Sequence, residues 1–240
     1  GVEAYRQKLL EKCFRGWPEL TTQHEESPVR LQFEAEHDGL HLAAWNFSPQ
    51  PNIELTLYTL RSSKVATEDL KLTVLNVLDE AGWSKFLSTV RPGFSSNFQR
   101  EVVTEADDAA LGELKELLKS QPWGMAYVCP RGIGPTAWDQ SVRKQTQHRR
   151  RFMQLGQTQD GMRVWDVRRA IQSLQLLPGY SQVPVWLQAE GPSAGLALYA
   201  SLFEGDKVAR LDLYNLPATH HDGPIFLNVL RVTDVPLTVG

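Results

Sequence analysis

The spacing of apolar residues changes once along this chain, and that change limits the folds open to it. Between residues 29 and 77, apolar residues alternate with polar ones or run together in four short segments. A period of two is typical of β-strands, and turn residues at 37–39 and 48–52 separate the segments. We therefore expect three or four mostly antiparallel strands, preceded by a helix over residues 3–15.

The later part of the chain alternates helices with short strands. Apolar residues three or four positions apart predict helices at residues 104–119, 162–176, 194–203 and 224–232, with a short helix or irregular segment at 80–90. Thr104 is the predicted cap of the first of these helices. Buried strands are predicted at residues 124–129, 183–189 and 208–216. This alternation indicates βαβ units, so we expect an α/β fold with a mostly parallel sheet flanked by helices.

Length and composition limit the number of domains and the classes of binding partner. A chain of 240 residues suits one continuous domain, with residues 1–100 as an N-terminal helix and β-rich lead-in and residues 101–240 as the core. The net charge of −3 gives no global basic field, so we expect no nucleic-acid partner. No apolar run approaches the roughly 20 residues that cross a bilayer, so we expect no membrane span. The oligomeric state stays open.

Motifs for cofactors and metals are missing from the sequence. It contains neither of the common glycine-rich nucleotide-binding patterns and no metal-ligand spacing, so the expected cofactor and metal are none. Cys13 and Cys129 stand among apolar residues and are predicted to be buried thiols. The basic run at 143–151 is expected to be a solvated loop, although it could meet phosphates or an acidic sugar.

One short motif is a candidate nucleophile elbow. Gly191-Pro192-Ser193-Ala194-Gly195 lies between a predicted buried strand and a helix of small residues. A nucleophile elbow needs a serine on a sharp strand-to-helix turn, with small residues two positions before and after it. Gly191 and Gly195 occupy those positions around Ser193.

The register of this turn decides its chemistry. With Ser193 at the tip, its hydroxyl could attack an ester and the N–H of Ala194 could bind the oxyanion. With Gly191 at the tip, the nucleophile position holds no side chain, and Pro192 supplies no N–H. The first register is the one we favour, and an ordinary strand–helix turn in which Ser193 caps the helix is the third possibility.

Two other segments could complete such a site. The loop after the 124–129 strand contains Arg131 and Gly132, and either N–H could be the second oxyanion donor. Downstream of Ser193, the only histidines are His220 and His221, which follow a strand and are candidates for the catalytic base. They could equally belong to a polar surface loop. No residue stands out as the acid.

Several segments resemble bacterial acetyl-xylan-esterase-like α/β-hydrolases: residues 130–138, 149–174, 194–204 and 211–231. The resemblance covers roughly residues 100–240 and is most specific in the Arg-Gly loop and in an Asp-x-x-Arg-Ala helix. It implies an α/β-hydrolase sheet, deacylation of a decorated carbohydrate, and an extracellular or periplasmic location if the substrate is a polysaccharide. It also aligns Gly191, rather than Ser193, with the nucleophile, as in a degenerate member.

Two functions follow as hypotheses. The first is a serine ester hydrolase for an acylated carbohydrate, with Ser193 as nucleophile, His220 or His221 as base, and Ala194 with Arg131 or Gly132 as oxyanion donors. The second is a catalytically inactive hydrolase-fold protein that serves as a structural or binding module. A further possibility is that the chain is a piece of a longer enzyme.

Overall fold

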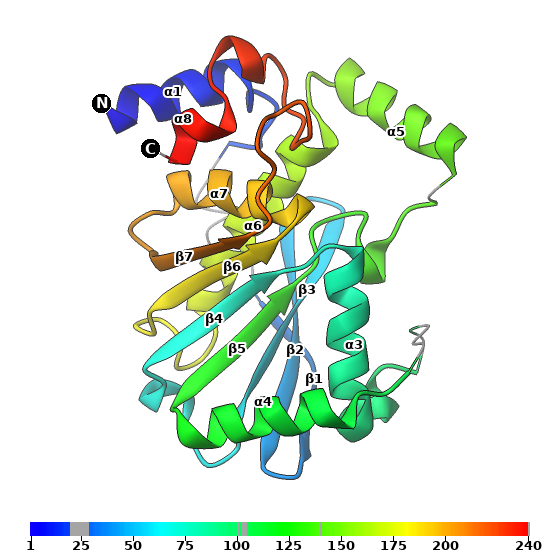
Figure 1. The fold of residues 1–240 in the computed structure, drawn as a ribbon, viewed down its shortest axis with the longest axis vertical. Coiled ribbons are helices and arrows are strands. Elements are labelled where there is room, and N and C mark those ends of the chain that lie inside the picture. Colours follow the sequence, from blue (N-terminus) through cyan, green and yellow to red (C-terminus); the bar gives the residue numbers. More distant parts are fainter. Residues whose placement is uncertain (20–28, 100, 102–104, 140, 240) are drawn as a thin grey trace.

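The computed structural model describes residues 1–19, 29–99, 101, 105–139 and 141–239, which form one mixed sheet between layers of helices (Figure 1). The sheet has seven strands in the order β1-β2-β3-β5-β4-β6-β7. Its antiparallel strands are β1 (Arg30–His37), β2 (Leu40–Gln50) and β3 (Ile53–Ser62). Its parallel strands are β4 (Leu72–Val77), β5 (Trp123–Val128), β6 (Val185–Glu190) and β7 (Val208–Tyr214).

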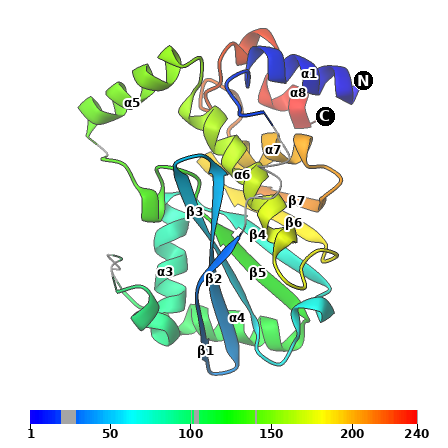
Figure 2. The same cartoon turned by 180° about the vertical axis from the view of Figure 1, so that it is seen from behind.

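The helices divide between the two faces of the sheet. On the face toward the viewer in Figure 1 lie α3 (Glu80–Phe94) and α4 (Asp108–Ser120). On the opposite face, seen in Figure 2, lie α6 (Gln159–Leu176) and α7 (Pro192–Phe203). The terminal helices α1 (Val2–Lys12) and α8 (Val235–Val239) lie together beyond α7, and α5 (Val142–Gln154) projects from the end of the sheet. The sheet therefore combines strands from both sides of residue 100.

Each face of the sheet has its own apolar core. The larger core joins the sheet to α6, α7 and α1, and includes Leu9, Leu187 and Tyr199, all fully buried. The smaller core joins the sheet to α3 and α4, and includes Phe94 and Leu60. Because the parallel strands are covered on at least one face, they carry long apolar runs, which is why their positions were visible in the sequence.

The predicted α/β fold with a mostly parallel core and antiparallel N-terminal strands is confirmed. Several boundaries differ. The segment at 80–90 belongs to a full helix, and α4 begins after a cap at Asp107, whose side chain accepts from the N–H of Ala110; Thr104 lies outside the described residues. Residues 224–232 do not form the predicted helix, because Asn228 has a φ of 54° and only a short 3-10 turn follows it. The basic run is the helix α5, not a loop.

Candidate functional site

The turn between β6 and α7 has Gly191 at its tip. The pairing of β6 with β7 continues through Glu190 and Tyr214, and the N–H of Gly191 still donates to the carbonyl of Tyr214 at 2.9 Å. The chain then reverses at Gly191, whose φ of 57° and ψ of −129° are unfavourable for residues with a side chain. Pro192 opens α7, where its fixed φ suits the first helical position. The favoured register, with Ser193 at the tip, is therefore not the one that the chain adopts.

Ser193 lies inside the first turn of α7. Its side chain is buried, and no hydrogen-bond partner is found for its Oγ among the described residues. A buried hydroxyl on the core side of a helix has no path to a substrate. The structure thus separates Ser193 from the tip of the turn that the nucleophile role requires.

The predicted oxyanion donors all have partners within the protein. The N–H of Ala194 donates to the carbonyl of Gly191 at 3.0 Å. The N–H of Arg131 donates to Asp166 Oδ2 at 2.9 Å, and that of Gly132 donates to Thr136 Oγ1 at 3.1 Å. These three N–H groups therefore do not form the predicted oxyanion hole, because each already donates a hydrogen bond to another group of the protein.

Gly195 has a packing role on the opposite side of α7. A Cβ atom on Gly195 would lie 2.4 Å from Cδ of Pro224, so only glycine allows the 223–224 loop to approach the helix. The small residue two positions after Ser193 therefore serves helix–loop packing, and not a strand–helix approach at the elbow.

A buried ion pair fixes the Arg-Gly loop to α6. Arg131 Nε donates to Asp166 Oδ2 at 2.8 Å, and its Nη2 donates to Oδ1 at 2.6 Å and to Gln50 Oε1 at 3.2 Å. Burial raises the pKa of the Asp166 carboxyl, and the hydrogen bonds and positive charge of Arg131 oppose that rise. Both carboxylate oxygens act as acceptors, so the Arg-Gly loop and the Asp-x-x-Arg-Ala helix form one structural unit.

The two candidate bases lie away from Gly191. His220 is buried against α7, where its Nε2 and the Tyr199 hydroxyl are 2.6 Å apart and its Nδ1 and the carbonyl oxygen of Pro224 are also 2.6 Å apart. Burial lowers its pKa, and the Pro224 carbonyl opposes that change. His221 is exposed, and its N–H donates to Thr219 Oγ1. Neither histidine contributes to the cavity beside Gly191.

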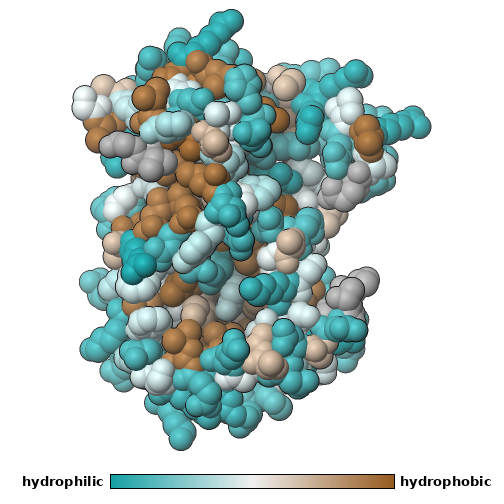
Figure 3. Space-filling model, in the orientation of Figure 1, coloured by the Kyte–Doolittle hydropathy of each residue, from teal (hydrophilic) through white to brown (hydrophobic). Residues whose placement is uncertain are grey.

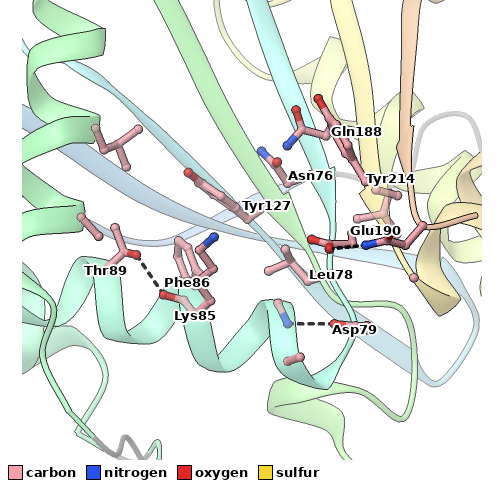
Figure 4. Close-up of a pocket in the computed structure, with 18 of the residues that line it drawn as sticks. Asn76, Leu78, Asp79, Lys85, Phe86, Thr89, Tyr127, Gln188, Glu190 and Tyr214 are labelled. Carbon is pink, nitrogen blue, oxygen red and sulfur yellow. Dashed lines mark hydrogen bonds between the residues drawn. The ribbon is translucent and has the colours of Figure 1, made fainter.

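A cavity of about 680 Å³ opens beside Gly191, over the face of the sheet that α3 and α4 cover only in part (Figure 4). Its floor is a row of side chains from adjacent strands: Tyr127 pairs with Asn76, and Asn76 pairs with Gln188. Paired residues of a sheet point to the same face, and Figure 4 shows these three side chains facing the same space. Glu190 and Tyr214 form a second row nearer the turn.

The polar groups of this floor have spare hydrogen-bonding capacity. Asn76 Nδ2 donates to the carbonyls of Val74 and Ala126, which directs its amide while its Oδ1 remains an acceptor. In the part of the chain that the structure describes, neither the Tyr127 hydroxyl nor the Gln188 amide has a protein partner. Burial raises the pKa of Tyr127 far above its ordinary value, so its hydroxyl stays a neutral donor. The cavity can therefore bind a polar, uncharged ligand.

Sequence reasoning missed these residues because it followed one serine motif. The available signal was positional, since Asn76, Tyr127, Gln188 and Tyr214 all lie near the carboxyl ends of predicted buried strands. In open α/β sheets, ligands bind at that edge. Among the described residues, no group of three or more histidine, cysteine or acidic side chains could hold a metal ion, and no helix has the length and apolar character of a membrane span.

Comparisons with known proteins identify solved structures that share this fold. No protein-family model and no curated protein matches the sequence. Solved structures do match: a Bacteroides fragilis protein classed as an acetyl xylan esterase has a TM-score of 0.62 at 13% identity, over 88% of this chain and 51% of its own. A glucuronoyl esterase from Solibacter usitatus has a TM-score of 0.55 at 10% identity, over 92% and 60%. Acetyl xylan esterase 1 from Thermoanaerobacterium sp. has a TM-score of 0.50 at 9% identity, over 88% and 56%.

The sheet order, the helices on both faces and these matches define an α/β-hydrolase fold, as the resemblance implied. The structures that it matches include acetyl xylan esterases and glucuronoyl esterases. The chain spans between 51% and 60% of the length of these three proteins. At such low identity the likeness concerns the fold, and the activity has to be argued from the site.

Proposed function

We propose that this chain is a hydrolase-fold unit that binds carbohydrate at the carboxyl edge of its sheet without serine catalysis. The observation that carries the proposal is Gly191 at the tip of the turn, followed by Pro192. Acyl transfer needs a nucleophile at that tip and a backbone N–H to stabilise the oxyanion. Glycine offers no nucleophile, and the proline after it offers no N–H.

The cavity beside Gly191 supports the binding role. Its volume of about 680 Å³ lies within the range of roughly 300–1,000 Å³ found for small-molecule sites. The rings of Tyr127 and Tyr214 provide flat apolar surfaces, while Asn76 Oδ1 offers an acceptor and the Gln188 amide offers both donors and an acceptor. A sugar ring presents the same combination of apolar faces and hydroxyl edges. The names of the matching esterases, which include acetyl xylan esterases, agree with a carbohydrate ligand.

A labelling experiment tests the absence of serine catalysis. We expect no reaction with a fluorophosphonate probe, and p-nitrophenyl acetate hydrolysis no faster than that of a Ser193→Ala variant. A Gly191→Ser variant should also stay unlabelled, because neither histidine reaches the tip and Pro192 lacks an N–H. Stoichiometric labelling of the unmodified protein, lost in Ser193→Ala, would refute the proposal.

A titration experiment tests the binding role. Xylo-oligosaccharides are the probe, and calorimetry is the measurement. Gln188→Ala and Tyr127→Phe should each weaken binding about tenfold, since each removes a hydrogen bond of roughly 1–1.5 kcal/mol. Gln121→Ala is a matched control, because Gln121 is exposed and lies outside the cavity. Equal affinity in all three variants would argue against the cavity as the site.

The second candidate is the serine ester hydrolase of the sequence hypothesis, because the matching structures are named as esterases. Among the described residues, its structural support is the unpartnered Oγ of Ser193. It requires the first turn of α7 to open and a base to approach, and activity lost in both Ser193→Ala and His220→Ala would favour it.

A further inference from the structure

The helix α5 is a cationic element on a protein of negative net charge. Its 13 residues contain five lysine and arginine residues and no aspartate or glutamate: Arg143, Lys144, Arg149, Arg150 and Arg151. The whole chain carries a net charge of −3, so the rest of the molecule is acidic. All five side chains are exposed, and Figure 3 shows that the projecting part of the surface is mostly hydrophilic.

One face of α5 attaches the helix to the body. The rings of His148 and Phe152 lie 5.0 Å and 5.9 Å from the ring of Trp138. The guanidinium of Arg163, on α6, lies 5.6 Å from the same ring. The other face of α5 is left to solvent, and Figures 1 and 2 show the helix standing clear of the body.

The helix α5 follows a loop that starts at the same edge of the sheet as the cavity. The chain enters α5 from the loop that leaves the carboxyl end of β5, and the N–H of Gly134 in that loop lies 3.4 Å from Glu80 Oε1 at the start of α3. The cavity is bounded at the same end by Asp79, which caps α3, and by Gly191. The loop that follows β5 therefore leads from the edge of the sheet at which the cavity opens to α5.

Four of the five cations of α5 form two rows of two residues each. Residues seven apart lie on the same side of a helix, so Arg143 aligns with Arg150 and Lys144 aligns with Arg151. Seven residues correspond to about 10 Å along the axis. The row of Gln147 and Gln154 runs between the two cationic rows and adds neutral hydrogen-bonding groups.

We propose that this face of α5 binds an acidic polysaccharide in which uronic acid residues are interspersed among neutral sugars. The inference rests on the proposed carbohydrate-binding function and extends it to the charge of the ligand. Arginine is suited to carboxylates because its planar guanidinium can hold both oxygens. Each strand of duplex DNA carries one phosphate charge per about 3.4 Å of helix axis, whereas the two cations within each row of α5 are about 10 Å apart. A densely charged polymer would also be repelled by the acidic body.

The test compares two sugars that differ only in charge. The probes are neutral xylo-oligosaccharides and xylo-oligosaccharides of equal length that carry glucuronic acid, titrated at low and high salt. We expect the acidic probe to bind at least threefold more tightly at low salt, with the difference shrinking as salt screens the charges. Equal affinities at low salt would overturn the proposal.

Charge variants locate the effect on α5. The double variant Arg143→Gln/Arg150→Gln should lose the preference for the acidic probe while its affinity for the neutral probe is unchanged. Lys8→Gln/Lys12→Gln in α1 removes the same charge from another exposed helix face and should keep the preference. An equal loss in both variants would show a general charge effect and refute a site on α5.

Two further outcomes distinguish a failure of the α5 proposal from a failure of the proposed carbohydrate binding in the cavity. If the neutral probe does not bind, the cavity proposal fails, but acidic-probe binding that depends on Arg143 and Arg150 still supports the α5 site. Tighter binding of single-stranded DNA or of anionic vesicles than of the acidic probe would overturn the polysaccharide assignment.

Discussion

At the scale of single residues, Gly191 decides what this turn can do. The residue combines a left-handed φ of 57° with open space, since a Cβ atom there would have Asp79 Oδ2 as a neighbour at 3.6 Å. The obstacle to a side chain is therefore the backbone conformation and not a clash. A glycine at the tip gives an unstrained turn but no nucleophile, whereas a serine there would be strained.

The first prediction concerns Gly191→Ala. We expect it to lower the free energy of unfolding by about 1–2 kcal/mol, because L-residues are strained at positive φ. Gly112→Ala is the matched control: Gly112 lies in α4 with nothing within 4 Å of an added Cβ atom, so alanine should stabilise the helix by up to about 1 kcal/mol. Urea denaturation measures both, and shifts of the same sign would contradict the argument.

The second prediction concerns the ion pair of Arg131 and Asp166. Asp166→Asn should cost about 3–5 kcal/mol of stability, because it leaves the Arg131 charge buried without its partner. Glu116→Gln breaks the ion pair with Lys119, in which both side chains are largely exposed, and should change stability by less than about 0.5 kcal/mol. Chemical denaturation compares them, and a small effect in Asp166→Asn would mean that water reaches the pair.

At the scale of elements, the start of each helix decides where functional groups stand. Asp79 caps α3 by accepting from the N–H of Gly82, so its carboxylate is held at the rim of the cavity. Pro192 starts α7 and thereby moves Ser193 into the helix. Thr158 caps α6, the helix that carries Asp166 and packs against α7. The first residues of the helices therefore position the side chains of the site, as the carboxyl ends of the strands also do.

The third prediction concerns the cap of α6. Thr158→Ala should destabilise the protein by about 1–2 kcal/mol, because Thr158 Oγ1 accepts from the N–H of Gly161 at 3.0 Å and the site is buried. Thr146→Ala in α5 is the control, since Thr146 is exposed and donates only to the carbonyl of Val142 within its own helix. Thermal unfolding should separate the two variants clearly, and equal melting temperatures would contradict the capping role.

At the scale of the whole molecule, the terminal helices α1 and α8 are joined to α7 by a partly buried polar network. The Tyr5 hydroxyl of α1 hydrogen-bonds Thr233 and Thr238, and Tyr199 of α7 bonds Thr238 and His220. His220 is therefore a structural residue, which ties the 219–224 loop and both terminal helices to α7. Its neutral form fits this network, because Nδ1–H donates to the Pro224 carbonyl and Nε2 accepts from Tyr199.

The fourth prediction concerns pH. Burial lowers the pKa of folded His220 below its ordinary value of 6.5, so the unfolded chain binds a proton more readily below that pH. Stability should be independent of this group above pH 6.5 and should fall as the pH decreases toward the folded pKa. Melting temperatures between pH 7 and 5.5 measure the slope. His220→Gln should flatten it and His221→Gln should not, and an unchanged slope in His220→Gln would refute the assignment.

The sequence alone determined the architecture. Apolar periods of two and of three to four residues were sufficient to place all seven strands near their observed positions and to predict a change from antiparallel to parallel pairing, because burial on one or two faces of a sheet leaves a local pattern. The sequence grouped β4 with the mostly antiparallel strands, but β4 pairs in parallel with both β5 and β6, since pairing depends on segments far apart in the chain.

Only the tertiary structure decided the site. The register of the turn at Gly191 depends on how far β6 stays paired with β7, and the final bond to Tyr214 is a contact between separate strands. The N–H groups of Arg131 and Gly132 were assigned to a substrate from the sequence, but their partners, Asp166 and Thr136, are set by folding. Local patterns record which residues are buried, whereas the direction of a hydroxyl, an amide or an imidazole is fixed by its neighbours in space.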